Sequence, residues 1–307
     1  MKTATRVAPL VLALAGCAEV LDIPPDPELV TLGPWGCLAE PRERPLPLAA
    51  TARVLIQACD FVTDCVTPVT GLVGRLCAKS DIGCVDPLQT DLRDSSGLFS
   101  IDVPTGDEGF DGYLEVTSAT APCTGAAFGA YGPILCGLEP DCHPEAPDEH
   151  CAMPIYVRSL LYFNPPIVSD SIGPQPLPLL AAAAIPTLVQ AAGTNLDPTT
   201  GNLFITAVDC DGAPAAGVSY SIDADPDLVT QLYMHGGAVS DTNLQTDDSG
   251  IGGFLGVPPG FAEVQGYNRR YQKVGVIGVQ TEPFTVTYSA LAPEPEPEPE
   301  PEPAPEP

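Results

Sequence analysis

The sequence predicts an all-β protein made of two antiparallel Greek-key β-sandwich domains that are stapled by disulfide bonds. Three observations support this prediction. Short segments of alternating apolar residues recur along the chain and are separated by turn residues. Proline and glycine account for 37 and 29 of the 307 residues, whereas aromatic residues make up only 6%, a balance that favours short strands and many turns. The chain also has 11 cysteines, enough for several disulfides.

A turn-and-strand signature occurs twice. Residues 246–260 read TDDSGIGGFLGVPPG, and residues 90–104 read TDLRDSSGLFSIDVP. Both segments contain a polar turn, an aromatic residue and a Val-Pro pair in the same order. Asp, Ser and Gly favour turns, and apolar residues at alternate positions favour a strand with one buried face. Each copy therefore predicts a turn, a strand and a second turn.

These motifs resemble the carboxypeptidase regulatory-like, or transthyretin-like, β-sandwich module, in which a T-D-x-x-G-x-F hairpin precedes a V-P-x-G turn. Residues 209–218, DCDGAPAAGV, resemble the D-x-x-G-x-P-x-x-G-V turn that opens the same module. The two copies span roughly two thirds of the chain. The resemblance implies a β-sandwich fold and no catalytic activity.

The N-terminus resembles a bacterial export signal. Lys2 and Arg6 form a positively charged region before a short apolar segment, residues 7–13, that could not span a bilayer as a helix. Leu-Ala-Gly-Cys at 14–17 resembles the bacterial lipobox, which implies that residues 1–16 are a lipoprotein signal peptide and that Cys17 becomes acylated. A plain secretory signal with an incidental cysteine is the alternative. We expect the acyl chains on Cys17 to anchor the protein in the lipid bilayer.

The residue after Cys17 is Ala18 rather than Asp, a choice that resembles the sorting signal for export to the outer membrane. We therefore expect a lipid-anchored protein of the bacterial cell envelope, in the outer membrane. Prolines predict that residues 17–50 form an extended tether, and we expect Trp35 to dock that tether onto a domain rather than to bind a ligand. Alternating Pro and Glu predict a disordered, solvated tail at residues 292–307.

Between tether and tail we expect a first β-sandwich with cysteine-rich loops at 51–165, a connector at 166–200 and a second β-sandwich at 201–291. A short helix should begin in the connector near Pro186 and end at Gly193. The expected strands lie at 53–59, 72–78, 98–103, 113–118, 155–163, 201–209, 217–223, 261–267, 273–279 and 284–289.

The cysteines predict a disulfide frame, because exported thiols usually pair. None of them forms a Cys-x-x-Cys motif, so the zinc-ribbon and thioredoxin alternatives lose their main support. With Cys17 acylated, an even number remains: Cys37, Cys59, Cys65, Cys77, Cys84, Cys123, Cys136, Cys142, Cys151 and Cys210. Cys210 is the only one after residue 201, so full pairing requires a bridge from Cys210 to the N-terminal half, with its partner left open.

Two segments contain residue types that bind metals. Residues 141–151 include Cys142, His143, His150 and Cys151, a set that could hold zinc or copper, but a local Cys142–Cys151 disulfide closing a solvated acidic loop is the preferred interpretation. Asp223, Asp225 and Asp227 alternate as calcium ligands can, although an EF-hand would need Gly and Glu where Leu228 and Met234 stand. A solvated acidic loop is again preferred. We expect no metal and no cofactor.

The sequence contains no nucleophile elbow, P-loop, zinc-binding HExxH or GxGxxG motif. The chain has three histidines, and we expect His235 to lie in a hairpin turn. A formal charge of −28 disfavours binding to nucleic acid. We predict a non-catalytic envelope lipoprotein that acts as a surface scaffold, adhesion or ligand-recognition module for an extracellular or periplasmic protein or glycan. The alternatives are a metal- or glycan-binding surface lipoprotein and a hydrolase.

Overall fold

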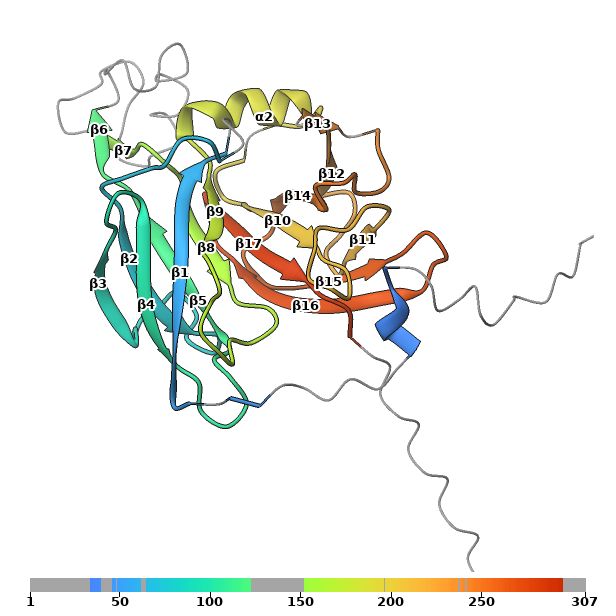
Figure 1. Cartoon of the computed structure of the whole chain (residues 1–307). Coiled ribbons are helices and arrows are strands. Elements are labelled where there is room, and N and C mark those ends of the chain that lie inside the picture. The colour runs from blue at the N-terminus through green and yellow to red at the C-terminus, as the bar shows by residue number, and fades with distance from the viewer. Residues whose placement is uncertain are drawn as a thin grey trace, which may run out of the picture.

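The computed structural model describes residues 34–39, 46–47, 49–61, 65–122, 152–195, 197–236, 238–240 and 242–294. These residues form seventeen strands and a few short helical segments, which confirms the predicted all-β fold class (Figure 1). None of the helices in the described ranges has the length and apolar character needed to cross a bilayer.

The first half contains β1 (Thr51–Asp60), β2 (Val73–Ala78), β3 (Gln89–Arg93), β4 (Leu98–Pro104), β5 (Gly112–Thr117), β6 (Thr120–Pro122), β7 (Ala152–Pro154), β8 (Arg158–Tyr162) and β9 (Gln175–Leu179). The second half contains β10 (Gly201–Ala207), β11 (Ser219–Ile222), β12 (Thr230–His235), β13 (Ala238–Ser240), β14 (Ile251–Val257), β15 (Gly260–Tyr267), β16 (Lys273–Thr281) and β17 (Thr285–Leu291). The helical segments are η1 (Gly36–Ala39), η3 (Ala182–Ala184) and α2 (Ile185–Ala191).

The first sandwich packs the sheet β4-β1-β9 against strands β3, β2, β5 and β8. Strands β1 and β4 show the alternation of buried and exposed residues that a sheet with one solvated face requires. Their inward side chains, among them Ile56 and Phe99, meet Leu76 and Leu114 of the opposite sheet. One hydrophobic core thus holds the two layers of the first sandwich together.

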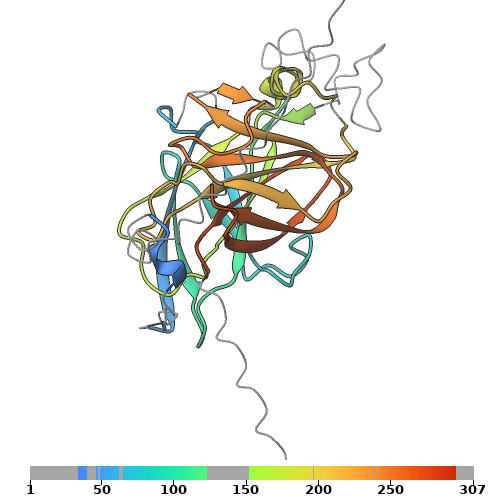
Figure 2. The ribbon, with the colours of Figure 1, turned by 90° about the vertical axis from the view of Figure 1, so that its right-hand side faces the viewer.

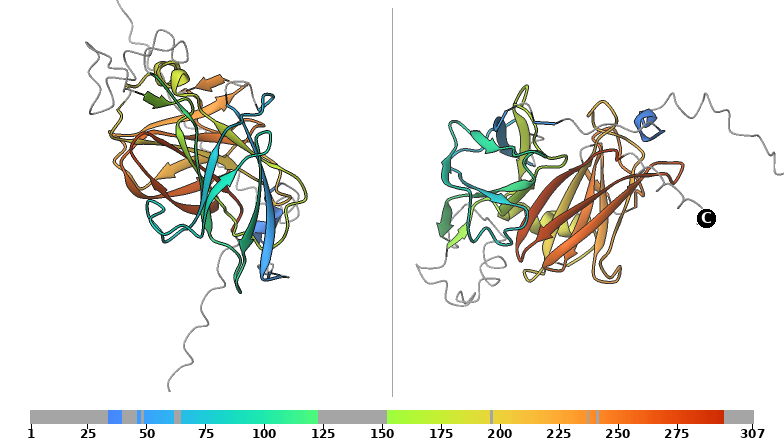
Figure 3. Two further views of the ribbon diagram at one scale, coloured as in Figure 1. Left: turned by 90° about the vertical axis from the view of Figure 1, so that its left-hand side faces the viewer. Right: turned by 90° about the horizontal axis from the view of Figure 1, so that it is seen from below.

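The second sandwich packs strands β14, β10 and β17 against the sheet β11-β15-β16. Its core contains Leu203 and Ile205 from β10, and Val264 and Ile277 from the covering sheet. Viewed from below, the strands of the second sandwich, coloured yellow to red, lie beside those of the first, coloured cyan to green (Figure 3).

The two sandwiches share a pairing pattern, as the repeated signature suggested. In the first, β1 pairs antiparallel with β4 and parallel with β9; in the second, β10 pairs antiparallel with β14 and parallel with β17. The turns before β4 and β14 also match. Asp94 accepts a hydrogen bond from the Gly97 amide, and Gly250 donates its amide to the Asp247 carbonyl. Both glycines have positive φ, 82° and 69°, as such turns require.

The sandwiches are fused through a parallel pairing of β8 with β17, which creates one sheet of nine strands, β13-β12-β14-β10-β17-β8-β5-β2-β3. Strand β17 is buried on both faces because it lies near the middle of this sheet. Three of the strand pairings, β1–β9, β10–β17 and β8–β17, are therefore parallel, in contrast to the expected antiparallel pattern. The domain boundaries drawn from the sequence stay a prediction.

The segment expected as a connector contributes both a strand and a helix. Strand β9 includes Pro176 and Pro178, which are compatible with a strand because β9 lies at the edge of its sheet. Helix α2 has Pro186 in its first turn and buries Ile185, Leu188 and Val189 in the core that continues from the first sandwich. Figure 2 shows this helix almost end-on, at one end of the strands.

Candidate functional site

Six of the predicted disulfide cysteines lie within the described ranges, and all six are bonded. The pairs are Cys59–Cys65, Cys77–Cys84 and Cys37–Cys210, with Cα atoms 4.7, 5.5 and 5.8 Å apart. The remaining candidates lie outside the described residues: Cys17, Cys123, Cys136, Cys142, His143, His150 and Cys151.

The Cys37–Cys210 disulfide ties the N-terminal segment to the second sandwich, although the first sandwich follows that segment in the chain. The Cys210 amide donates to the Pro34 carbonyl at 3.1 Å, which adds a backbone contact to the covalent bond. Trp35 packs against the second hydrophobic core, as expected for a docking residue. The chain that leads to the predicted anchor is thus fixed to the half of the molecule that is farther along the sequence.

The aspartates proposed as calcium ligands lie in an exposed turn after β11. The Asp223 carboxylate accepts the Glu263 amide at 2.9 Å, and the Asp225 carboxylate accepts the Asp227 amide at 3.0 Å. These bonds cap the local backbone, which is the usual role of Asp in turns. Among the described residues, these aspartates do not gather into a group of three potential ligands. The structure does not bring them together as a calcium site would require.

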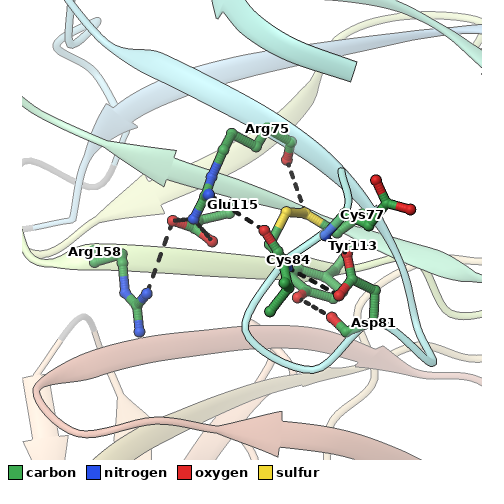
Figure 4. The surroundings of a disulfide bond; sticks show 9 residues. Arg75, Cys77, Asp81, Cys84, Tyr113, Glu115 and Arg158 are labelled. Carbon is green, nitrogen blue, oxygen red and sulfur yellow. Dashed lines mark hydrogen bonds and ion pairs between the residues drawn. A yellow bond between two sulfur atoms is a disulfide. The ribbon is translucent and has the colours of Figure 1, made fainter. Parts of the chain in front are cut away.

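One group of potential metal ligands does occur in the described part of the chain: Cys77, Cys84 and Glu115, all buried. The two sulfur atoms are bonded to each other, so they cannot act as thiolate ligands in this state. Both carboxylate oxygens of Glu115 accept hydrogen bonds from Arg75 Nη2, at 2.7 and 2.8 Å. The arrangement in Figure 4 is therefore a disulfide beside an ion pair, and it has the chemistry of a structural site.

The ion pair is part of a cluster that extends across the joint between the sandwiches, the region where β8 pairs with β17. Glu115 on β5 is only 3% exposed and also lies 3.8 Å from Arg158 Nη1 on β8. Arg158 in turn forms an ion pair with Glu282, which follows β16 in the second sandwich. The strand register produces this arrangement because Arg75 on β2 lies opposite Glu115. A buried charge requires such partners, and through Arg158 the cluster links the first sandwich to Glu282 of the second.

The loop closed by Cys77–Cys84 is held rigidly beside this cluster. Tyr113 Oη donates to the Asp81 carbonyl at 2.7 Å, and Arg75 Nη1 donates to the Cys84 carbonyl at 3.3 Å (Figure 4). The Asp81 carboxylate accepts the backbone amides of Val85 and Asp86, directly after the loop, both at 2.9 Å. Each polar group named here thus forms a hydrogen bond with the backbone of this segment.

A cavity of about 130 Å³ lies at the joint, between Tyr162 and Asn164 of the first half and Ser289 and Glu294 of the second. Pockets for small-molecule ligands usually have volumes of about 300 to 1,000 Å³. Lys79 at its rim forms an ion pair with Asp111 at 3.3 Å. A space of this size and polarity suits a few water molecules better than an organic substrate.

The residues around His235 do not form a catalytic triad. Ser249 Oγ donates directly to the Asp247 carboxylate at 2.6 Å, where a triad would place an imidazole between the serine and the acid. Burial opposes ionisation of Asp247, but hydrogen bonds from Ser249 and from the Gly236 amide, with the nearby His235, hold the pKa of this carboxyl below its usual value. His235 is exposed at the end of β12, where the chain turns, as expected. No other histidine lies among the described residues.

Buried tyrosines should make the fold sensitive to alkali. Burial raises the pKa of Tyr233 to about 12 and raises the pKa of Tyr220, whose ring stacks on it, well above its usual value. Below pH 10 the folded and unfolded states are both protonated, whereas above it the unfolded state loses its tyrosine protons first. We therefore expect the free energy of unfolding to fall between about pH 10 and 12. Urea unfolding at a series of pH values measures this effect, and a constant midpoint across that range would contradict it.

The ion-pair cluster was not anticipated from the sequence. The sequence contained one weak indication of it. Glu115 lies two residues after the inward-facing Tyr113, so both side chains point to the same face of the strand, and a charged residue on a buried face requires a partner. The partner residues Arg75, Arg158 and Glu282 lie on separate elements, so no local motif could have identified them.

No protein-family model matches the sequence, and no curated protein is significantly similar to it. Among solved structures, the TIE protein of Bacillus anthracis is 12% identical with a TM-score of 0.23, over 80% of this chain and 34% of that chain. A streptococcal ancillary pilin is 11% identical with a TM-score of 0.20, over 78% of this chain and 68% of that chain. A putative adhesin from Bacteroides ovatus is 11% identical with a TM-score of 0.22, over 80% of this chain and 94% of that chain. The chain thus spans about a third of the length of the first neighbour, and scores this low assign neither a family nor a function.

Proposed function

We propose that the protein is a non-catalytic lipoprotein of the bacterial cell envelope, which presents a rigid pair of β-sandwiches on a lipid anchor as a scaffold for recognition. The lipobox-like residues 14–17 and the proline-rich tether support the anchor. The three disulfides in the described part of the chain support an oxidising compartment, because such bonds are rare in reducing cytosol.

The observation that carries this proposal is the Cys37–Cys210 disulfide. Without this disulfide, the N-terminal segment would be connected to the folded body only through β1 of the first sandwich. The disulfide instead attaches the tether to the second sandwich as well, across a sequence separation of 173 residues. Together with the β8–β17 pairing and the Arg158–Glu282 ion pair, it makes the body suited to bearing load as one unit.

The polar clusters in the described ranges also favour a structural role. Glu115 and Asp81 are engaged by arginine or backbone donors, and the cavity at the joint is small. An enzyme of the hydrolase type would need a nucleophile and a base that converge on a substrate-sized pocket. We propose in addition that the protein is located in the outer membrane and is exposed at the cell surface.

The anchor is tested by the mass of the mature N-terminal peptide. We expect Cys17 to be the first residue and to carry acyl chains, because the lipobox resemblance places the cleavage before it. Replacing Cys17 by alanine should move the protein from the membrane fraction to the soluble fraction, since several acyl chains at about 0.8 kcal/mol per buried methylene supply the attachment. An unmodified thiol on Cys17, or processing that globomycin does not block, would refute the anchor and leave a secreted protein.

A further inference from the structure

The turn between β15 and β16 gathers unpaired basic side chains on an otherwise acidic protein. Arg53, Arg75, Lys79 and Arg158 each form an ion pair with a carboxylate. The remaining basic residues of the described ranges form none, and three of them, Arg269, Arg270 and Lys273, lie in and beside this one turn. Residues 268–273 are named the basic turn below. A formal charge of −28 makes such a concentration of free positive charge exceptional for this chain.

The basic turn is held in one conformation by Asn268, which is 4% exposed. Its side-chain oxygen accepts the Arg270 amide at 2.9 Å and the Gln272 amide at 3.1 Å, and its carbonyl accepts the Tyr271 amide at 2.8 Å. This network orders the backbone into a fixed frame that carries the exposed residues Arg269 and Lys273, and the Arg269 side chain lies against Gly217. A fixed frame reduces the entropy lost when a ligand binds.

Tyr271 is the second unusual feature of the basic turn. Its φ is 60°, a left-handed conformation that is disfavoured for a large side chain and would suit glycine. Its ring is 86% exposed, so burial in the core does not explain the choice of residue. Strained, exposed residues of this kind often mark binding sites. An exposed aromatic ring next to Arg270 is a surface on which proline rings can pack.

The C-terminal segment begins beside this surface. The Glu294 amide donates to the Val274 carbonyl at 2.8 Å, and the Ala292 carbonyl lies against Gly275. Residues 292–294 therefore lie against the first residues of β16, directly after Lys273. Residues 295–307 follow and alternate proline with glutamate at positions 296, 298, 300, 302 and 306.

We propose that residues 295–307 bind the basic turn of the same chain, with glutamates paired to Arg269, Arg270 and Lys273 and prolines packed on Tyr271. The positive charges of the basic turn complement the glutamates of the repeat, and the Tyr271 ring complements its prolines. Thirteen residues in polyproline conformation span about 40 Å, more than enough to reach a turn that lies next to their starting point. Covalent attachment raises the effective concentration of the segment at the turn to the millimolar range. The bound segment shields the turn from other anions.

Zero-length carbodiimide crosslinking of the full mature chain, followed by peptide mapping, tests this contact. Lys79 and Lys273 are the two lysines in the described ranges. Both lie near the start of the segment, since Lys79 shares the joint cavity with Glu294. We expect monomeric protein to show crosslinks from Lys273 to glutamates of 295–307. Their yield should drop several-fold in 1 M salt, where the screening length is about 3 Å.

Surface variants supply the controls. Arg269→Ser with Arg270→Ser keeps the Lys273 reporter and should lower its crosslink yield several-fold, and Tyr271→Gly should lower it while relaxing the backbone. Arg93→Ser removes an exposed arginine on β3, the other one without an ion pair in the described ranges, and should leave the yield unchanged. Crosslinks that favour Lys79, or a yield insensitive to salt and to the arginine variants, would overturn the proposal. Crosslinks found only in dimers would also overturn it, by assigning the segment to a second copy.

Discussion

Replacing Cys37 and Cys210 by serine is expected to lower the free energy of unfolding by about 5 kcal/mol, because chain entropy grows with the length of the loop that a disulfide closes. The two residues are separated by 173 positions, the longest separation of the three disulfides described. Equilibrium unfolding in guanidinium, with the other disulfides intact, measures the loss. The variant should also release Trp35 from its contact with the second core, which tryptophan fluorescence reports.

The matched control is the double serine variant of Cys59 and Cys65. That pair has a sequence separation of 6, and the same entropic argument gives a loss of about 2 kcal/mol. Equal losses for the two variants would show that loop length does not govern their contributions. An unchanged unfolding midpoint for the Cys37 and Cys210 variant would show that the N-terminal segment detaches before the fold opens, and would remove the main support for the proposed rigid scaffold.

Replacing Glu115 by alanine is expected to lower the free energy of unfolding by about 1.5 to 3 kcal/mol, the contribution of hydrogen bonds to a charged group, because the side chains of Arg75 and Arg158 that remain are 39% and 30% exposed and stay hydrated. Arg75 and Arg158 would lose their shared carboxylate, and Arg158 would keep only Glu282 across the joint. Urea unfolding of the variant measures the loss. Conversion of one unfolding transition into two would show in addition that the cluster couples the sandwiches.

The comparison for this prediction is the exposed pair of Arg53 and Asp102, whose side chains are 60% and 59% exposed. Exposed ion pairs contribute about 0 to 1 kcal/mol, so Asp102→Ala should change the unfolding free energy only slightly. If Glu115→Ala and Asp102→Ala change the free energy of unfolding by the same small amount, burial does not determine how much these ion pairs contribute to stability. The assignment of Glu115 as the centre of the joint would then fail.

Much of the local structure follows from the sequence alone. Alternating apolar residues predicted β1, β4 and β15, because the side chains of a strand point to opposite faces at every second residue. The repeated Asp-to-Gly turns before β4 and β14 were recognisable, since their hydrogen bonds form between residues three positions apart. Strand β9 was missed because its two prolines resemble a chain break.

The sequence by itself thus determined the all-β class, the repeated sandwich signature, the short helix and the presence of a disulfide frame. These features depend on side-chain alternation, turn chemistry and composition, which act over a few residues. Only the tertiary structure decided that Cys210 bonds Cys37, that β8 and β17 join the sandwiches, and that Arg75 and Arg158 meet Glu115. Each of these contacts joins residues that are far apart in the chain, so it depends on the position and register of strands that no local sequence pattern determines.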